Sequence, residues 1–518
     1  DFIVKSLDDV LKIHFGKSLA SENVHVLDPF TGTGTFIVRT LSYLKEQMDE
    51  GKINLADITR KFTQELHANE IILLSYYIAA INIEATYDEI NGTEEGYVPF
   101  DGIVLTDTFE STEDDKVIED TYFITNDDRL KVQQKVPITA IIGNPPYSIG
   151  QSSVNDNNQN LNYPKLNASI EMTYAKYSKA NLKKAVYDSY IQAFRWSSDR
   201  IKELGVIGFV SNGSFIDSQS TDGFRKVLFE EFNHLYIFHL RGDQRTQGET
   251  SRREGGKIFG SGSRAPIAIS ILIKDGSDEH KIHYADIGDY LSRDEKLSIL
   301  KNAESIKGID WQEITPDENN DWINQRDSNY LNYASLYDDK DKDNSIYLDQ
   351  LTGVNSARDA WVSGFSREKV IKNTTKLVEN YNSEIERLIE NKNPKERTEL
   401  VNKKENFISW TRGLTQSFGK GKELSIDPNK IRLFMHRPFT KKWLFYDRSV
   451  MEMPSRYYDI AGNTGKIVYL QGQGMNKPFS SLITELVPSF QFVGNGKGFP
   501  MYKGMDDGGK ISNLSKRF

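Results

Sequence analysis

Two short motifs, each placed directly after a largely apolar run, constrain the fold of this chain more than any other feature. The glycine-rich segment 28–34 follows the run 24–27, and Asn-Pro-Pro-Tyr at 144–147 follows the run 138–142. Such runs are typical of buried parallel strands, and in open α/β sheets ligands bind just beyond the carboxyl ends of those strands. We therefore expect both motifs on one rim of a single sheet.

Segments of strand and helix length alternate along the first half of the chain. Besides the two runs above, strands are expected at 103–105, 206–210, 235–238 and 266–273, and helices at 35–48, 68–84, 186–204 and 223–232. This alternation predicts an α/β fold with a doubly wound, mostly parallel sheet.

The periodicity weakens after Lys274, so we place a domain boundary near 295 and expect domains at 1–295 and 296–518. The second domain contains a segment of helical composition at about 366–404. Beyond residue 407, short apolar runs alternate with Gly, Pro and aromatic residues. This pattern indicates an α+β domain.

Composition excludes several classes of protein. The 518 residues are 38% hydrophobic, which suits a globular chain of more than one domain. No apolar run approaches the roughly 20 residues that cross a bilayer, so no membrane contact is expected. The absence of Cys excludes disulfides and fits a reducing cytoplasm, and eight His without a His-Glu-x-x-His pattern give no reason to expect a metal.

Charge is distributed unevenly. A net charge of −9 argues against indiscriminate coating of nucleic acid, but the segment 412–448 holds nine Lys or Arg against three acids, and the segment 241–264 holds six against three. Such segments either contact phosphates or form a solvated surface or a disordered insertion. The basic candidates for phosphate contact are Arg241, Arg245, Arg252, Arg253, Lys257, Arg437, Lys441 and Lys442.

The glycine-rich segment has the features of a cofactor-binding loop. Gly32 and Gly34 allow a sharp turn beneath a ligand, and the helix that follows presents free N–H groups. Asp28 can order the loop and meet a cationic ligand. The spacing lacks the full G-x-G-x-x-G dinucleotide signature, which disfavours a dehydrogenase, and a simple tight turn is the alternative.

Two carboxylates are candidates for cofactor contacts. A cofactor with ribose hydroxyls requires a carboxylate beyond the next strand, and Glu65 is the best placed by order, although it could instead cap the following helix. Asp107, after the expected strand 103–105, could accept a hydrogen bond from an adenine amine.

The Asn-Pro-Pro-Tyr motif indicates chemistry on an amino group. Its two prolines fix the backbone so that the Asn144 amide and one carbonyl point outward together, and both accept hydrogen bonds from an NH2 group. Two acceptors free the nitrogen lone pair for in-line attack on a sulfonium methyl. Tyr147 offers a flat face on which an extruded base can stack.

At these residues the sequence resembles the amino-methylating DNA methyltransferases of the gamma motif order, in which a Rossmann-like methyltransferase domain precedes a target-recognition domain. The resemblance implies an adenine N6 target held by Asn144 and the Pro145 carbonyl, with Pro146 completing the motif and Tyr147 stacking on the base. Phe259 is the candidate for a second stacking aromatic. S-adenosylmethionine would be bound by Asp28, Phe30, Thr31, Gly32, Gly34, Glu65 and Asp107.

More of the chain resembles one subgroup, the single-chain type ISP restriction-modification enzymes. The resemblance includes 140–148, 186–190, 240–242, 255–264, 437–439 and 492–496. It implies double-stranded DNA with a specific recognition sequence as partner, and nuclease and helicase-like domains upstream in a longer chain. Neither a G-x-x-x-x-G-K-[ST] phosphate loop nor a nuclease carboxylate cluster occurs in this sequence, so we expect it to methylate and recognise DNA without cutting or translocating.

Other assignments stay open at this point. Cytosine N4, RNA and a protein glutamine amide all present an NH2 group to similar motifs, and base identity rests on the resemblance alone. The large last domain and the basic loop favour DNA. A DNA-binding specificity module with little methylation activity is the alternative from another class.

Overall fold

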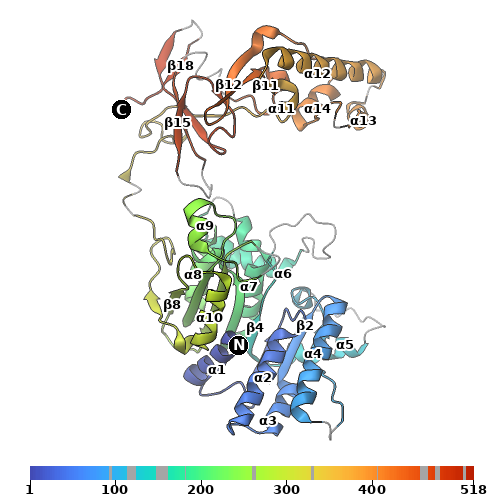
Figure 1. The fold of residues 1–518 in the computed structure, drawn as a ribbon, viewed down its shortest axis with the longest axis vertical. Coiled ribbons are helices and arrows are strands. Elements are labelled where there is room, and N and C mark those ends of the chain that lie inside the picture. Colours follow the sequence, from blue (N-terminus) through green and yellow to red (C-terminus); the bar gives the residue numbers. More distant parts are fainter. Residues whose placement is uncertain are drawn as a thin grey trace. The chain divides into compact units, whose positions relative to one another are not determined.

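A nine-stranded sheet organises the first part of the chain, in the order β3-β2-β1-β4-β5-β7-β6-β8-β9. Figure 1 draws this sheet and labels its strands β2, β4 and β8. Its strands are β1 (His25–Asp28), β2 (Leu66–Glu70), β3 (Ile103–Leu105), β4 (Ile138–Gly143), β5 (Gly205–Asn212), β6 (His234–Arg241), β7 (Ile267–Lys274), β8 (Lys281–Asp286) and β9 (Gln312–Ile314). Strands β1 to β5 pair in parallel, as do β6 and β8, whereas β7 is antiparallel to β5 and β6 and β9 is antiparallel to β8.

This computed structural model describes residues 1–92, 96–113, 124–147, 162–180, 183–259, 264–327, 329, 332–391, 393–404, 406–455, 465–472, 479–505 and 509–518. The chain forms two compact units, Asp1–Asp327 and Ser328–Phe518. Among the described residues, no helix combines the length and the apolar character needed to cross a membrane.

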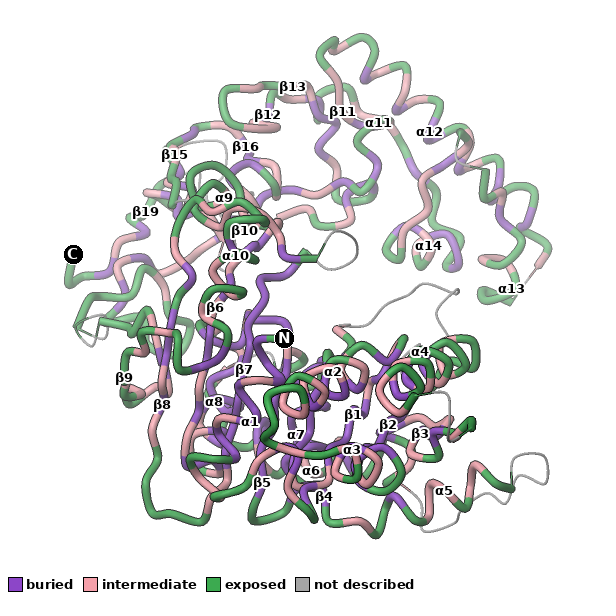
Figure 2. The backbone as a smooth tube through the Cα atoms, turned by 60° about the horizontal axis from the view of Figure 1, so that its bottom comes forward, coloured by how far each residue is buried: buried purple, intermediate pink, exposed green. Residues whose placement is uncertain are grey.

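Helices cover both faces of the large sheet, and a separate hydrophobic core lies under each set. One core joins the sheet to α1 (Phe2–Phe15) through Leu7, to α2 (Thr35–Asp49) through Leu41 and to α4 (Leu73–Asn91) through Ile83. The other core joins it to α7 (Ser189–Ile201) through Phe194 and to α8 (Asp222–Glu231) through Phe224. Buried stretches of backbone run through the central strands in Figure 2. The expected doubly wound α/β fold is confirmed.

The helices of the first unit vary widely in length. They are α1 (Phe2–Phe15), α2 (Thr35–Asp49), α3 (Leu55–Arg60), α4 (Leu73–Asn91), α5 (Ile124–Lys135), α6 (Pro164–Ile170), α7 (Ser189–Ile201), α8 (Asp222–Glu231), α9 (Gly248–Glu254) and α10 (Arg293–Ala303).

The structure corrects the expected buried helix at 68–84. Strand β2 occupies Leu66–Glu70, and the helix that follows, α4, begins only at Leu73. This helix is largely exposed, with Ala79, Ile83 and Tyr87 as its buried residues. Strand β2 has the sequence Leu-His-Ala-Asn-Glu, in which three of the five residues are polar although all five are buried, so no apolar run marks it in the sequence.

The first unit also extends further along the chain than the boundary expected near 295. Strand β9 adds to the sheet, and Trp322, only 2% exposed, lies in the core beneath α8. Fully buried Arg225 of α8 forms an ion pair with Asp321 at 2.6 Å. Residues 296–327 therefore complete the first unit.

The second unit contains helices and mostly antiparallel strands, as expected for an α+β domain, and β16 pairs in parallel with β12. One four-stranded sheet contains β10 (Leu351–Thr352), β17 (Lys497–Pro500), β14 (Ile467–Leu470) and β15 (Ser481–Thr484), and the other contains β11 (Ser363–Gly364), β13 (Thr440–Phe445), β12 (Ile431–Arg437) and β16 (Val487–Pro488). Strands β18 (Tyr502–Gly504) and β19 (Lys510–Ser512) form a separate pair. The helices are α11 (Asp359–Val362), α12 (Arg367–Leu388), α13 (Pro394–Glu399) and α14 (Arg412–Gly419).

Candidate functional site

The glycine-rich loop connects β1 to α2 and is held first by its own residues. The Phe30 N–H donates to Asp28 Oδ1 at 3.1 Å, and Thr31 Oγ1 donates to the Asp28 carbonyl at 2.9 Å. Gly32 and Gly34 both have positive φ, 56° and 89°, which side chains with a Cβ rarely adopt. A Cβ on Gly34 would also lie 3.2 Å from the Ala79 carbonyl oxygen of α4, so this glycine allows α4 to pack closely.

Neighbouring strands hold the same loop from the side. The Thr31 N–H donates to the Asn69 carbonyl at 3.0 Å, and the Gly32 N–H donates to Glu70 Oε2 at 2.7 Å. From beyond β3, Thr108 Oγ1 donates to the Pro29 carbonyl at 2.6 Å. The loop conformation thus depends on the ends of β2 and β3 as well as on its own glycines.

Asp28 lies beneath this loop and does not line the cavity described below. It is fully buried, which raises the pKa of its carboxyl to about 8, and within the described part of the chain its Oδ2 has no hydrogen-bond partner. The carboxyl is therefore predominantly neutral at pH 7. This favours its expected role in ordering the loop over contact with a cationic ligand.

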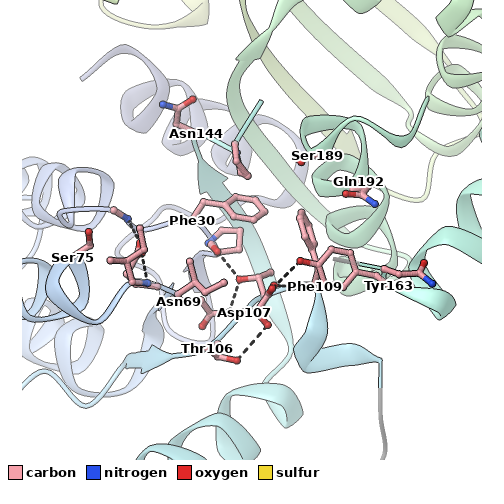
Figure 3. A pocket seen from close by; sticks show the side chains of 18 of the residues that line it. Phe30, Asn69, Ser75, Thr106, Asp107, Phe109, Asn144, Tyr163, Ser189 and Gln192 are labelled. Carbon is pink, nitrogen blue, oxygen red and sulfur yellow. Dashed lines mark hydrogen bonds between the residues drawn. The ribbon is translucent and has the colours of Figure 1, made fainter. Parts of the chain in front are cut away.

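A cavity of about 550 Å³ opens over the loop and reaches the end of β4 (Figure 3). Its size is that of small-molecule sites. Of the residues expected at the site, Phe30, Gly32, Asp107, Asn144 and Pro146 line it. The lining residues that sequence reasoning missed include Asn69, Glu70, Ile71, Ile72, Ser75, Phe109, Asn162, Tyr163, Asn167 and Gln192.

Glu65 is not at this rim, and the expectation for it is corrected. It ends a short helical turn before β2, where it accepts from the Asn23 N–H at 2.6 Å and pairs with buried Lys61 at 2.8 Å. The acidic residue at the carboxyl end of β2 is Glu70, whose oxygens accept from the Gly32 and Ile72 N–H groups. The error follows from the missed strand, since a carboxylate can be assigned to a rim only when the strand is located.

Asp107 lies at the cavity wall, held by two donors on different elements. Its Oδ1 accepts from the Phe109 N–H at 2.9 Å, and its Oδ2 accepts from the Tyr163 hydroxyl at 2.8 Å. Burial, and then the charge of Asp107, raise the pKa of Tyr163 and keep that hydroxyl a donor. Beside it, the rings of Phe30 and Phe109 lie 5.5 Å apart and form an apolar part of the wall.

The Asn-Pro-Pro-Tyr motif adjoins the loop because β4 packs closely on β1. A Cβ on Gly143, the residue before the motif, would lie 3.2 Å from Asp28 Oδ1, so glycine permits this approach. Asn144 is exposed to the cavity, Pro145 is buried, and Tyr147 is half-buried. The Tyr147 hydroxyl donates to Asn144 Oδ1 at 2.6 Å, and burial raises the pKa of Tyr147, so the hydroxyl stays protonated.

Acidic residues pair with several basic side chains of the loop after β6, which its composition did not indicate. Arg241 pairs with Asp286 at 2.7 Å and with Asp289 at 2.5 Å, and Arg245 pairs with Asp243 at 2.8 Å. Arg252 and Arg253, on α9, have side chains 79% and 57% exposed, with acids at 3.5 and 3.8 Å. These two arginines are the more available cations.

The remaining candidates for DNA contact are not among the residues that line the cavity. Lys257 is half-buried, and Phe259 is 36% exposed at the border of residues 260–263, which lie outside the described residues. In the second unit, Arg437 ends β12, where it donates to Gln491 Oε1 at 2.9 Å. Lys441 and Lys442 lie on the adjacent strand β13.

Comparisons with known proteins identify both parts of the chain. Residues 44–246 match the model of the Eco57I restriction-modification methylase, and residues 345–518 match that of the type ISP C-terminal specificity domain. A comparison with the curated proteins found no match.

Three solved structures are similar over almost the whole chain. A nuclease-deletion mutant of the type ISP restriction-modification enzyme LlaGI, in complex with a DNA substrate mimic, is 58% identical, with a TM-score of 0.83 over 99% of this chain. The ATP-dependent type ISP enzyme LlaBIII bound to DNA is 46% identical (TM-score 0.81, 100%), and DrdV in a DNA complex is 32% identical (TM-score 0.80, 100%). The matches span 42%, 34% and 50% of those longer chains.

The fold, the site and the matched models together define a methylase domain followed by a specificity domain. The chain belongs to the type ISP restriction-modification family.

The raised pKa of Asp28 predicts a pH dependence of stability. The folded-state pKa of about 8 lies above the ordinary aspartate pKa of 3.8, so the folded state holds the proton more tightly and stability decreases as pH rises from about 4 to about 8. Asp28→Asn removes this titration. The variant should gain up to about 1.4 kcal/mol per pH unit relative to wild type over this interval, measured by urea unfolding. A difference that stays constant with pH would contradict the neutral carboxyl.

Proposed function

We propose that this chain transfers a methyl group from S-adenosylmethionine to the N6 amine of an adenine in double-stranded DNA, at a sequence recognised by its specificity domain. The supporting observation is that Gly32, Glu70 and Asn144 line one cavity, so that the cofactor seat adjoins the amide expected to hold the amine. The DNA complexes of LlaGI, LlaBIII and DrdV support DNA as the substrate.

The cavity fits S-adenosylmethionine by its chemistry. Glu70 retains lone pairs for ribose hydroxyls beside the Gly32 N–H, Asp107 can accept from an adenine amine, and the Phe30 and Phe109 rings offer apolar faces to a flat base. When bound, S-adenosylmethionine supplies an electrophilic methyl group on a sulfonium. In this assignment Glu70 replaces Glu65, and Asp28, Thr31 and Gly34 shape the loop.

The Asn-Pro-Pro-Tyr residues would prepare the amine. Asn144 Oδ1 and the Pro145 carbonyl accept its two hydrogens, which draws the nitrogen toward tetrahedral geometry and frees its lone pair for attack. Asn144 Oδ1 already accepts from the Tyr147 hydroxyl, so Tyr147 must turn or share this oxygen when a base enters. Turning would bring its ring toward the base, where it can stack.

Because the chain spans half or less of the similar solved chains, the activity of the whole protein is part of this proposal. Upstream nuclease and helicase-like domains would cut and translocate in the longer enzyme. Methylation of cytosine N4, and a specificity module with little methylation activity, are the alternatives that the first experiment separates.

The first experiment measures transfer of labelled methyl from S-adenosylmethionine to unmethylated genomic DNA, followed by nucleoside analysis. N6-methyladenine in one sequence context is expected, whereas N4-methylcytosine would reassign the base. Asn144→Ala should lower methyl transfer by about 100-fold or more while DNA affinity changes little, since the amide acts at the transition state. An equal loss of binding and transfer would contradict this role.

The two glutamates give a matched pair for cofactor binding. Glu70→Gln should weaken S-adenosylmethionine binding by about tenfold or more, because it removes a charged acceptor at the loop. Glu65→Gln should leave cofactor affinity near that of wild type but lower the unfolding temperature, since it leaves the buried Lys61 ammonium without its carboxylate. Calorimetric titration and thermal unfolding measure both effects. The opposite pattern would restore Glu65 to the cofactor site.

The exposed arginines of α9 give a prediction for DNA contact. Arg252→Gln with Arg253→Gln should weaken binding to all DNA sequences and reduce the slope of log affinity against log salt by up to about 1.8, since each phosphate contact contributes about 0.9. Lys45→Gln with Lys52→Gln is a control, because these lysines are also exposed and paired with acids. An unchanged slope in the arginine variant would remove α9 from the DNA interface.

A further inference from the structure

The turn between β12 and β13 carries an unusual residue at its tip. Arg437 pairs with Thr440, so the turn consists of Pro438 and Phe439 alone. Phe439 has a φ of 61° and is 88% exposed. A large aromatic ring is thus held in solvent on a left-handed backbone.

Neither local conformation nor packing explains a phenylalanine here. Proline fixes its φ near −65°, and a following residue with positive φ corresponds to a type II turn, where glycine or asparagine is the preferred residue. Because the ring is exposed, it contributes little hydrophobic stabilisation to the second unit. Positions at which a sequence violates its local rules without a compensating contact are where functional residues are expected.

The charges within the hairpin 431–445 favour an anionic partner. The segment 431–445 contains Arg432, Arg437, Lys441 and Lys442 and no acid. Lys441 is exposed, while the hydrogen bond from Arg437 to Gln491 ties its guanidinium beside the base of the turn. Lys442 Nζ lies 5.1 Å from the centre of the Phe365 ring, which is 74% exposed. Exposed aromatic side chains flanked by cations are suited to nucleic acid, because the rings can stack on bases while the cations pair with the adjacent phosphates.

We propose that Phe439 inserts as a wedge between neighbouring base pairs of the bound duplex, with Arg437 and Lys441 on the flanking phosphates. Apolar side chains inserted at a base step unstack it and bend the DNA, and that bend admits more protein surface. The assignment rests on the proposed recognition of DNA by this chain. It makes the turn 438–439 a deforming element of recognition, distinct from residues that read base edges.

The test uses the whole chain and a duplex of the sequence that the wild-type chain enriches from a random pool. The duplex carries 2-aminopurine at successive positions, because its fluorescence rises where stacking is lost. Phe439→Gly is the decisive variant, since glycine suits the positive φ and removes only the ring. Tyr333→Ala is the matched control, an aromatic that is 72% exposed outside this hairpin.

With wild type, fluorescence should rise at one base step in addition to the flipped base. Phe439→Gly should lose the signal at that step, keep the signal of the flipped base, and bind roughly 5- to 150-fold more weakly, the range for loss of one base–aromatic stack. Its unfolding temperature should equal or exceed that of wild type. Phe439→Trp should retain both signals, and Tyr333→Ala should behave as wild type.

Equal affinity and unchanged fluorescence in Phe439→Gly would overturn the wedge while leaving the proposed function intact. The wedge is also overturned if the glycine variant unfolds at lower temperature, because the ring then serves the fold, or if Tyr333→Ala weakens binding equally. A wild-type chain that enriches no sequence and methylates no DNA would overturn the proposed function, and the wedge with it.

Discussion

The hydrogen bond from the Gly32 N–H to Glu70 couples the glycine-rich loop to the neighbouring strand β2, and the geometry of the site depends on it. Together with the hydrogen bond from the Thr31 N–H to the Asn69 carbonyl, it fixes the position of the loop relative to the end of β2. Parallel pairing of β1 with β2 places these donors and acceptors at one rim. A loop held in this way needs little rearrangement to receive a ligand.

The second motif is fixed to the first by packing. Gly143 lies against Asp28, where a Cβ would stand only 3.2 Å from Asp28 Oδ1, and Asp28 avoids the cost of a buried charge by remaining protonated. The consequence is that Asn144 and Gly32 share one cavity although about a hundred residues separate the two motifs in sequence. The Tyr147–Asn144 hydrogen bond satisfies the amide oxygen, and under the proposed function a substrate amine would compete for it.

The two cationic segments, 241–264 and 431–445, differ in the acids that they contain. The Arg241 side chain, which composition made a candidate for phosphate contact, joins β6 to the end of β8 through Asp286, whereas Arg252 and Arg253 stay largely exposed. Because acids pair with Arg241 and Arg245, counting basic residues overestimates the cations available to a ligand in the segment 241–264. The segment 431–445 contains four basic residues and no acid of its own.

The sequence by itself determined the α/β class, the rim that carries both motifs and the α+β character of the last part, because strand runs, glycine spacing and the Pro-Pro turn are local signals. Only the tertiary structure revealed β2, in which three of the five residues are polar, placed Glu70 rather than Glu65 at the rim and extended the first unit to Asp327. Those features depend on which segments pair across the sheet and which charges are buried together, as with Arg225 and Asp321. Such long-range pairing leaves no periodic trace in the sequence, so a carboxylate five residues away can be mistaken for the one that reaches the loop.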